Sequence, residues 1–283
     1  MIDVAQELNQ KLRLERKLLA ELRQFNRALV RMVARDLGMG RPPNALALKP
    51  DVESMLTRQY DRVGPAFGSS LADRLPDDDK PTDIERQRIA AALTSYYALR
   101  APEQAEIISN TNQSDVDESI AMAQDMESNG RLELGLLAGV ILARKLNPRA
   151  NLIAMFETQA AAEAAKLTEA QVLTFQSPSI VSQTPAEATV RKTWATVGDE
   201  RVRPEHRAAD SQATDINKPF TVGGQQLQYP GDTSMGASAK NVINCRCSSV
   251  VDESDVLAVR RQRGQQPRTD TSVSEQLATS VGF

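Results

Sequence analysis

The side chains best suited to chemistry in this chain are concentrated between Lys192 and Cys247. The only histidine, His206, and the only two cysteines, Cys245 and Cys247, lie in this segment, as does the single tryptophan, Trp194. Imidazole and thiolate groups bind zinc and also serve as bases and nucleophiles in catalysis. The segment is therefore expected to form one compact unit: a metal site, a catalytic site or a cross-braced structural module.

Zinc binding is one interpretation of this group. The histidine and the two cysteines supply three ligands, whereas a structural zinc site usually has four, so Asp199, Asp210 or a water would have to complete the set. In the competing interpretation, a strand from Cys245 to Cys247 turns both thiols to one buried face, where cysteine behaves as a small apolar residue. Two cysteines separated by one residue would form a strained disulfide, so reduced thiols are expected. We expect no cofactor, with zinc as the open alternative.

Catalysis is a second interpretation. His206 could act as a general base oriented by Asp199, or as the partner of a cysteine nucleophile, while Arg201 or Arg203 contacts phosphate. The structural alternative is that these guanidinium groups hold Asp199 or Asp232 in bidentate ion pairs and pin the turns together. We expect the structural role, and hence no catalytic residue and no enzyme activity.

The spacing of residues predicts the elements that position this group. Alternation from Thr189 to Val197 predicts a strand, and its tryptophan is expected to anchor a small core. Pro204 favours the first turn of a short helix that carries the histidine. Gly223-Gly224 is typical of a hairpin and Asn244 of a turn, and the residues from Cys245 to Val251 indicate a final strand.

The N-terminal segment from Ile2 to Leu37 has the periodicity of a long amphipathic helix. It ends at a Gly38-Met39-Gly40 stop signal, which predicts a helix about 50 Å long. A helix of that length outreaches a small domain, so its apolar stripe is expected to pack on another chain or on a neighbouring long helix. The stripe consists of Leu8, Leu12, Leu19, Leu22, Leu29 and Val33.

Shorter helices are predicted to follow. Asp51 to Tyr60 indicates a short helix before a turn at Gly64-Pro65, and Thr82 with Glu85 fits a capping box. The acidic run Asp77-Asp78-Asp79 is expected to be a solvated loop and not an ion site. Prolines and glycines divide the remainder into separate predicted helices: one from about Pro102, then Ser114 to Met126, Leu132 to Leu146, and Asn147 to Leu167.

These patterns predict an α+β protein with a mainly helical N-terminal region, one long helix, a small α+β C-terminal module and a disordered tail. The predicted divisions are a long amphipathic helix at 1–45, a helical domain at 46–173, the module at 174–255 and a flexible tail at 256–283. The net charge of -3 does not favour tight nucleic-acid binding. The longest apolar runs fall short of the roughly 20 residues that cross a bilayer, and the N-terminus lacks a secretory pattern, so we expect a protein made in a cytoplasm without a membrane partner.

An ordered series of motifs runs through the C-terminal part: Trp194, Asp199, Arg201, Arg203, His206, Phe220, Gly223-Gly224, Pro230-Gly231-Asp232 and Asn244-Cys245-Arg246-Cys247. This series resembles the C-terminal signature of the phage Mu F-like minor head proteins, the head-morphogenesis family of tailed phages. The upstream Phe156-Glu157-Thr158 is similar to the segment that precedes that signature. The resemblance covers about residues 150–251. Where family members typically have an Asp-Gly pair after the histidine, this chain has Asp210-Ser211.

The resemblance implies a structural virion component of few copies, located in the capsid interior at the portal vertex and made in the host cytoplasm. Such a component supports head assembly, DNA packaging or genome delivery. The implied partners are the portal protein, the major capsid protein or both, with several copies around the portal and packaged DNA as a further possible contact. The alternative is a genome-associated ejected protein whose C-terminal module acts enzymatically on a nucleotide or nucleic acid.

Overall fold

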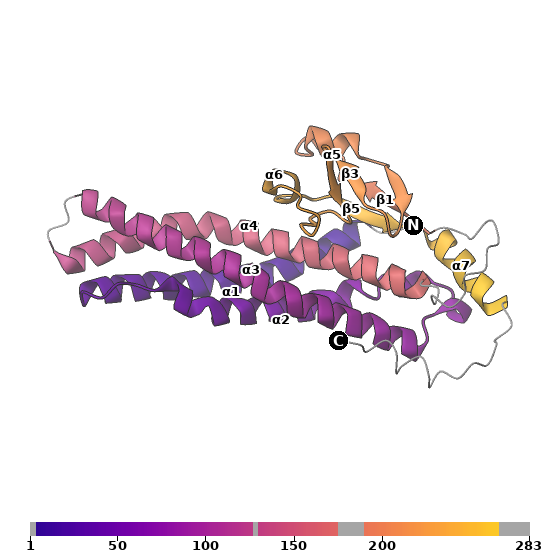
Figure 1. The fold of residues 1–283 in the computed structure, drawn as a ribbon, viewed down its shortest axis with the longest axis horizontal. Coiled ribbons are helices and arrows are strands. Elements are labelled where there is room, and N and C mark those ends of the chain that lie inside the picture. The colour runs from indigo at the N-terminus through magenta and orange to yellow at the C-terminus, as the bar shows by residue number, and fades with distance from the viewer. Residues whose placement is uncertain (1–3, 127–129, 175–189, 266–283) are drawn as a thin grey trace.

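Four long helices form an elongated bundle, and a small sheet-containing module lies on the side of one half of it (Figure 1). The computed structural model describes residues 4–126, 130–174 and 190–265. The bundle consists of α1 (Val4–Gly38), α2 (Lys49–Phe67), α3 (Asp83–Asp125) and α4 (Arg131–Thr174). This architecture confirms the predicted fold class: a helical N-terminal region that includes one long helix, followed by a small α+β module.

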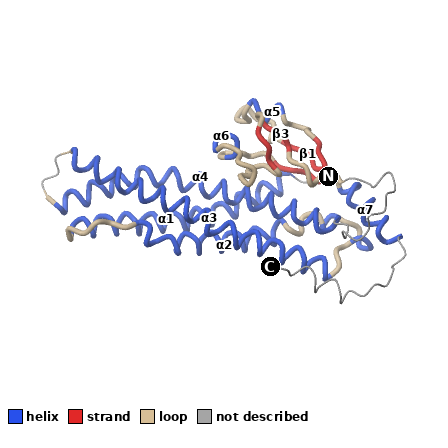
Figure 2. The backbone as a smooth tube through the Cα atoms, viewed as in Figure 1, coloured by secondary structure: helices blue, strands red, loops and turns tan. Residues whose placement is uncertain are grey.

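The prediction that prolines and glycines divide the bundle into many short helices is wrong. Pro65, Pro102 and Pro148 lie inside α2, α3 and α4, which continue past them (Figure 2). A proline inside a helix removes one backbone hydrogen bond and costs about 3 kcal/mol. Apolar packing on both sides of the proline offsets that cost in α4, where Leu146 and Ala150 flank Pro148 and are buried.

The partner of the long N-terminal helix is α4, which runs antiparallel to it. Lys166 near the end of α4 pairs with Glu7, while Gly135 near its start lies against Ala34. A side chain on Gly135 would place its Cβ 2.6 Å from the carbonyl oxygen of Ala34, so the close approach of the two helices requires glycine there. Of the two alternatives for the apolar stripe, the structure therefore contains the neighbouring long helix.

The predicted stripe is correct in the middle of α1 and wrong at its beginning. Leu22, Leu29 and Val33 are buried as expected, whereas Leu8 and Leu12 are 41% and 37% exposed. In its first turns α1 turns another set of residues inward, including Lys11, because α4 offers a buried carboxylate at that level. A charged residue in the buried face breaks the apolar periodicity on which the prediction rested.

Two side chains fix the start of α3, as predicted. The capping box is confirmed: Glu85 donates its backbone N–H to Thr82 Oγ1, and the Thr82 N–H donates to the Glu85 carboxylate.

The predicted start of the tail at residue 256 is wrong, because helix α7 (Glu253–Gln265) continues through it. Val256 and Val259 are buried against the bundle, which offsets the entropy of ordering this segment. Residues 266–283 and the polar spacer at 175–189 lie outside the described residues.

The module contains two small antiparallel sheets. In the first, β1 (Arg191–Ala195) is central, with β2 (Ala213–Asp215) and β5 (Ser248–Val251) on either side. The second is the predicted hairpin of β3 (Phe220–Val222) and β4 (Gln225–Leu227), whose turn is formed by two glycines with positive φ. Two short helices, α5 (Pro204–Ala208) and α6 (Ala239–Val242), complete it. None of the described helices is both long and apolar enough to span a bilayer.

Candidate functional site

The module is built around Trp194, which is fully buried as predicted. Its ring meets the rings of Phe220 and His206 edge to face, with centroid separations of 5.3 Å and 5.6 Å. Cys245 and Cys247 belong to the same buried cluster. The residues that suggested a site in the sequence are therefore neighbours in the core of the module.

Two short segments bring the histidine to the cysteines. Pro204 begins α5, as predicted, and His206 lies in its middle. The prediction of a strand starting at Cys245 is wrong, because β5 starts only at Ser248. The preceding segment is irregular: Asn244 has a φ of 59°, and the Cys247 carbonyl accepts a hydrogen bond of 2.6 Å from Gln159 of α4 instead of pairing in the sheet. Both thiols are buried as the structural interpretation required, although they do not lie on the face of one strand.

His206, Cys245 and Cys247, which we call the His–Cys cluster, converge within hydrogen-bonding distance. His206 Nδ1 lies 3.4 Å from the sulfur of Cys247 and 3.5 Å from that of Cys245. The candidate ligand atoms all lie within 4.8 Å of one another. The three residues are only 2%, 4% and 3% exposed. The cluster is therefore a preformed group of soft donor atoms inside the module.

The hydrogen-bond network assigns the tautomer of the histidine. Asn241 donates its amide to the Val222 carbonyl at 2.7 Å, so its Oδ1 faces His206 Nε2 at 3.0 Å. This contact favours a proton on Nε2, with Nδ1 directed at the two sulfurs. Arg203 Nη1 also lies 3.3 Å from Nε2, while its Nη2 donates to the Ile243 carbonyl, so the shorter contact with Asn241 decides the tautomer.

The two thiols have opposite electrostatic characters. A hydrogen bond from Cys247, with further help from His206, outweighs burial and lowers the pKa of Cys245 to about 5. The same hydrogen bond, together with burial, raises the pKa of Cys247. Burial acts to lower the pKa of His206, but the hydrogen bond to Cys245 and the charge on that sulfur raise it overall. Of the two thiols, Cys245 is thus the one whose ionised form the surroundings favour.

The predicted arginine clamp exists, but it uses a different arginine. Arg246 holds Asp199 with both guanidinium nitrogens, at 2.6 Å and 2.7 Å. Arg201 contributes only its backbone N–H to Asp199, and the Arg203 side chain is bonded to the Ile243 carbonyl and not to a carboxylate. The sequence placed several arginines near Asp199 without indicating which one the turns would bring to it.

The predicted arginine pairing of Asp232 is also wrong. Its buried carboxylate accepts hydrogen bonds from the backbone N–H groups of Gln228 and Ser234, both at 2.8 Å. Asp210, considered as a fourth metal ligand, instead accepts the backbone N–H of Thr196 at 2.8 Å. Both aspartates fix turns of the module.

The position where the resembling family has glycine adopts a glycine-like conformation here. Ser211 has a φ of 63°, in the left-handed region that costs a residue with a Cβ about 1 kcal/mol. Replacing Ser211 with glycine is therefore expected to raise the free energy of unfolding by about 1 kcal/mol in urea titrations. Ser238→Gly is the control: Ser238 has a φ of -69° and gains nothing from glycine, and the loss of its side-chain hydrogen bond to Gln225 should lower stability instead. A loss of stability in Ser211→Gly would contradict this account of the turn.

A buried polar network that sequence reasoning missed joins the module to the bundle. We call it the Glu163 network; it comprises Glu7, Lys11, Glu163, Lys166, Ser248 and Ser249. Glu163 accepts hydrogen bonds from Lys11 at 2.6 Å and from the backbone N–H of Ser249 at 2.8 Å. Burial acts to raise the pKa of Glu163, but the two lysines outweigh it and lower the pKa. One signal was present: alanines surround Glu163 on all sides of the helix, which is unusual for a charged residue facing solvent.

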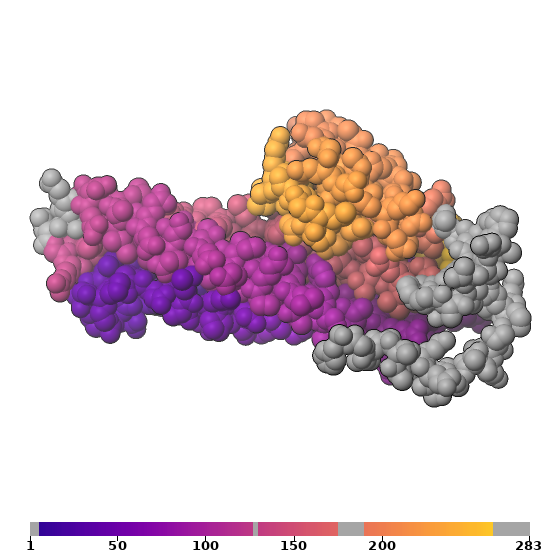
Figure 3. Space-filling model, viewed as in Figure 1, coloured from indigo at the N-terminus to yellow at the C-terminus, as the bar shows by residue number. Residues whose placement is uncertain are grey.

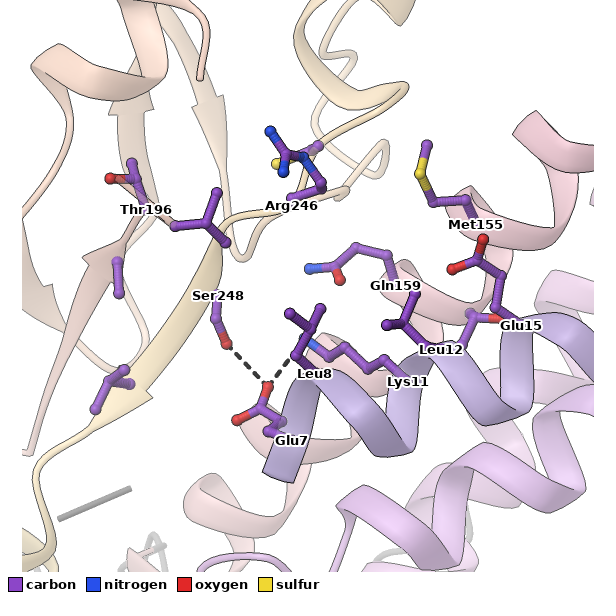
Figure 4. A pocket seen from close by; sticks show the side chains of 15 residues that line it. Glu7, Leu8, Lys11, Leu12, Glu15, Met155, Gln159, Thr196, Arg246 and Ser248 are labelled. Atoms are coloured by element: carbon purple, nitrogen blue, oxygen red, sulfur yellow. Dashed lines mark hydrogen bonds and ion pairs between the residues drawn. The ribbon is translucent and has the colours of Figure 1, made fainter. Parts of the chain in front are cut away.

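A cavity of about 180 Å³ lies beside this network, where α1 and α4 face the module. In Figure 4, Leu8 and Leu12 of α1 and Met155 of α4 lie across from Thr196 and Arg246 of the module. Ligand pockets usually enclose about 300–1,000 Å³. The cavity is thus better described as an imperfectly filled seam between two packed parts than as a substrate pocket.

The segment that resembles the family upstream of the module lies in α4, beneath the module. Phe156 packs against the cluster that contains Trp194. Glu157 is buried and paired with Arg100 at 3.1 Å, and it accepts a hydrogen bond of 2.6 Å from Tyr60. This segment therefore joins the module, through Phe156, to α2 and α3, through Glu157. Comparison of the chain with protein-family models, curated proteins and solved structures found no significant match.

Proposed function

We propose that this chain is a minor head protein of a tailed phage, a structural virion component that acts at the portal and the capsid interior. In this role it supports head assembly, DNA packaging or genome delivery, in several copies around the portal. The observation that carries the proposal is the convergence of the residues that resemble the family signature. Phe156, Trp194, His206 and the two cysteines form a single packed core, and Asp199 with Arg246 braces its surface.

The chemistry of the same residues favours bracing over catalysis. His206 is 2% exposed, and its Nε2 is committed to Asn241. Arg203 is committed to the Ile243 carbonyl, so two of the three groups of the enzymatic alternative cannot meet a nucleotide without breaking the module's own contacts. The third, Arg201, has an exposed side chain and supplies at most a phosphate contact, not a base. A general base must reach the proton that it removes. We therefore propose a non-enzymatic module.

The surface of the bundle supports a docking role. Leu132, Leu136 and Val140, which we call the α4 stripe, follow one another at intervals of four residues along the start of α4 and are 70%, 60% and 54% exposed. This end of the bundle stands clear of the module (Figure 3). Contiguous apolar patches on a protein surface often mark sites of contact with another protein. We propose the portal protein as the partner that covers the α4 stripe.

Sedimentation with the portal ring tests this function. The purified chain is expected to co-sediment with rings of the portal protein from the same phage, and the double variant Leu136→Glu/Val140→Glu is expected to bind at least tenfold more weakly. Leu99→Glu is the matched control, because Leu99 is 76% exposed on α3 outside the α4 stripe. Equal binding by the double variant and the control would reject the α4 stripe as the contact. No binding by the unaltered chain would reject the portal as partner.

A further inference from the structure

The His–Cys cluster has the composition and spacing of a zinc site. Zinc binds sulfur at about 2.3 Å and imidazole nitrogen at about 2.0–2.1 Å, so tetrahedral geometry separates the two donor atoms by about 3.5 Å. His206 Nδ1 lies 3.4 Å and 3.5 Å from the two sulfurs. We propose that His206, Cys245 and Cys247 bind one zinc ion, with a water molecule as the fourth ligand. This inference is independent of the portal contact.

The groups around the histidine have the arrangement that metal-binding histidines require. A ligating imidazole usually donates its other N–H to a fixed acceptor, which orients the ring and sets the tautomer. Asn241 supplies that acceptor, and its own amide is fixed by the Val222 carbonyl at 2.7 Å and by Gln225 at 3.1 Å. The ring of His206 is thereby held with Nδ1 toward the two sulfurs, the orientation that a ligating imidazole requires.

The backbone that carries the cysteines is held from both sides. Gln159 of α4 donates to the Cys247 carbonyl at 2.6 Å, and Arg203 donates to the Ile243 carbonyl just before the cysteines. Side chains that are already held in place lose little conformational entropy when they bind a metal ion, and this favours affinity. The metal would join α5 to the segment before β5, two parts of the module that have no strand pairing with each other.

A small cavity provides the position of the fourth ligand. It has a volume of about 10 Å³ and is lined by all three proposed ligands together with Asn244. This volume is about that of one water probe. The carboxylates that could have competed are otherwise engaged, because Asp199 pairs with Arg246 and Asp210 accepts the Thr196 N–H. The fourth position is therefore left to water.

The charge of the surroundings is compatible with this ion. Arg201, Arg203 and Arg246 line the same small cavity, and their positive charges, of which Asp199 offsets that of Arg246, disfavour a free cation. Two thiolates neutralise Zn²⁺, so the loaded cluster carries no net charge and the arginines face a neutral group. A hard ion such as Mg²⁺, held by neutral ligands, would lack this compensation and prefers oxygen donors. The cluster is therefore expected to discriminate strongly for zinc over magnesium.

Cobalt substitution of the full untagged chain tests the proposal directly. Cys245 and Cys247 are the only cysteines, so a thiolate-to-cobalt charge-transfer band can arise only from them. Stripped protein titrated with Co²⁺ is expected to show that band together with intense tetrahedral d–d bands, saturating at one equivalent, and zinc but not Mg²⁺ should abolish both. Metal analysis of the protein as purified should give about one zinc per chain. Zinc content near zero and no charge-transfer band would overturn the proposal and leave the thiols as packing groups.

Variants locate the site without relying on loss of folding. Asn241→Ala retains all three ligands and is expected to weaken zinc binding by about 10- to 100-fold, the usual effect of removing an outer partner of a ligating histidine. Asp210→Asn is the matched control and should bind zinc with unchanged affinity, because Asp210 serves a turn outside the cluster. Cys247→Ser should lose the charge-transfer intensity of one of the two cobalt–sulfur bonds. Unchanged zinc affinity in both Asn241→Ala and Cys247→Ser would place the ion elsewhere and overturn the proposal.

Discussion

Glu163→Gln is expected to lower the free energy of unfolding by about 3 kcal/mol, because it removes one of the two carboxylates, Glu163 and Glu7, that neutralise a pair of buried ammonium groups. Lys11 and Lys166 lie 2.6 Å and 2.8 Å from Glu163, and all three side chains are largely buried. The substitution keeps the volume of the side chain, so the loss of stability comes from the missing charge and not from a cavity. Urea denaturation followed by circular dichroism measures the change.

The control for this prediction is Glu118→Gln. Glu118 pairs with Lys145 at 2.5 Å between α3 and α4, but its side chain is 61% exposed, and such pairs contribute about 0–1 kcal/mol. Limited proteolysis of Glu163→Gln adds a second readout, because the network holds Ser249 of β5 and its loss should expose the module first. A Glu163→Gln loss no larger than that of the control would mean that the network does not fasten the module to the bundle.

The second large expected effect is a pH dependence of the chain's stability, which arises from Glu169. Burial raises the pKa of this carboxyl from 4.5 to about 7, although it accepts the backbone N–H groups of Leu71 and Ala72 and lies near Arg74; the charge of Asp73 adds to the increase. The folded state therefore binds the proton more tightly than the unfolded state does. Stability from this group is present below about pH 4.5 and is lost as the pH rises to about 7.

Comparison with Glu169→Gln isolates this contribution. Glutamine does not titrate, so the free energy of unfolding of the unaltered chain, relative to the variant, should fall by up to about 3 kcal/mol between pH 4.5 and pH 7.5. The hydrogen bond that glutamine cannot replace gives an offset at every pH and cancels in the comparison. A difference between the two proteins that stays constant with pH, or that changes in favour of the unaltered chain as the pH rises, would contradict the buried, proton-binding state of Glu169.

Elements defined by local chemistry were predictable from the sequence. Thr82 and Glu85 cap α3 because their spacing alone allows the two reciprocal hydrogen bonds. Gly223 and Gly224 turn the hairpin because both need positive φ, and Pro204 begins α5. In each case the cause lies within a few residues of the effect, so the sequence pattern contains it.

Features decided by distant partners were not predictable. Pro148 was expected to lie in the first turn of a separate helix, but α4 continues through it because its packing against α1 and α3 outweighs the local cost. The partner of Asp199 was placed on the wrong arginine, because the choice of Arg246 depends on where the segment before β5 runs. Glu163 was missed because its buried state depends on Lys11 and Ser249, which come from opposite ends of the described chain.

Cryo-electron microscopy of the assembled phage particle tests the central claim most directly. The account predicts density at the portal vertex, inside the capsid, that fits the elongated bundle with its side module in several copies around the portal axis. In that map the start of α4, with Leu132, Leu136 and Val140, should be covered by the portal protein. Purified, infectious particles that contain no copy of this chain would contradict the assignment as a structural component of the head.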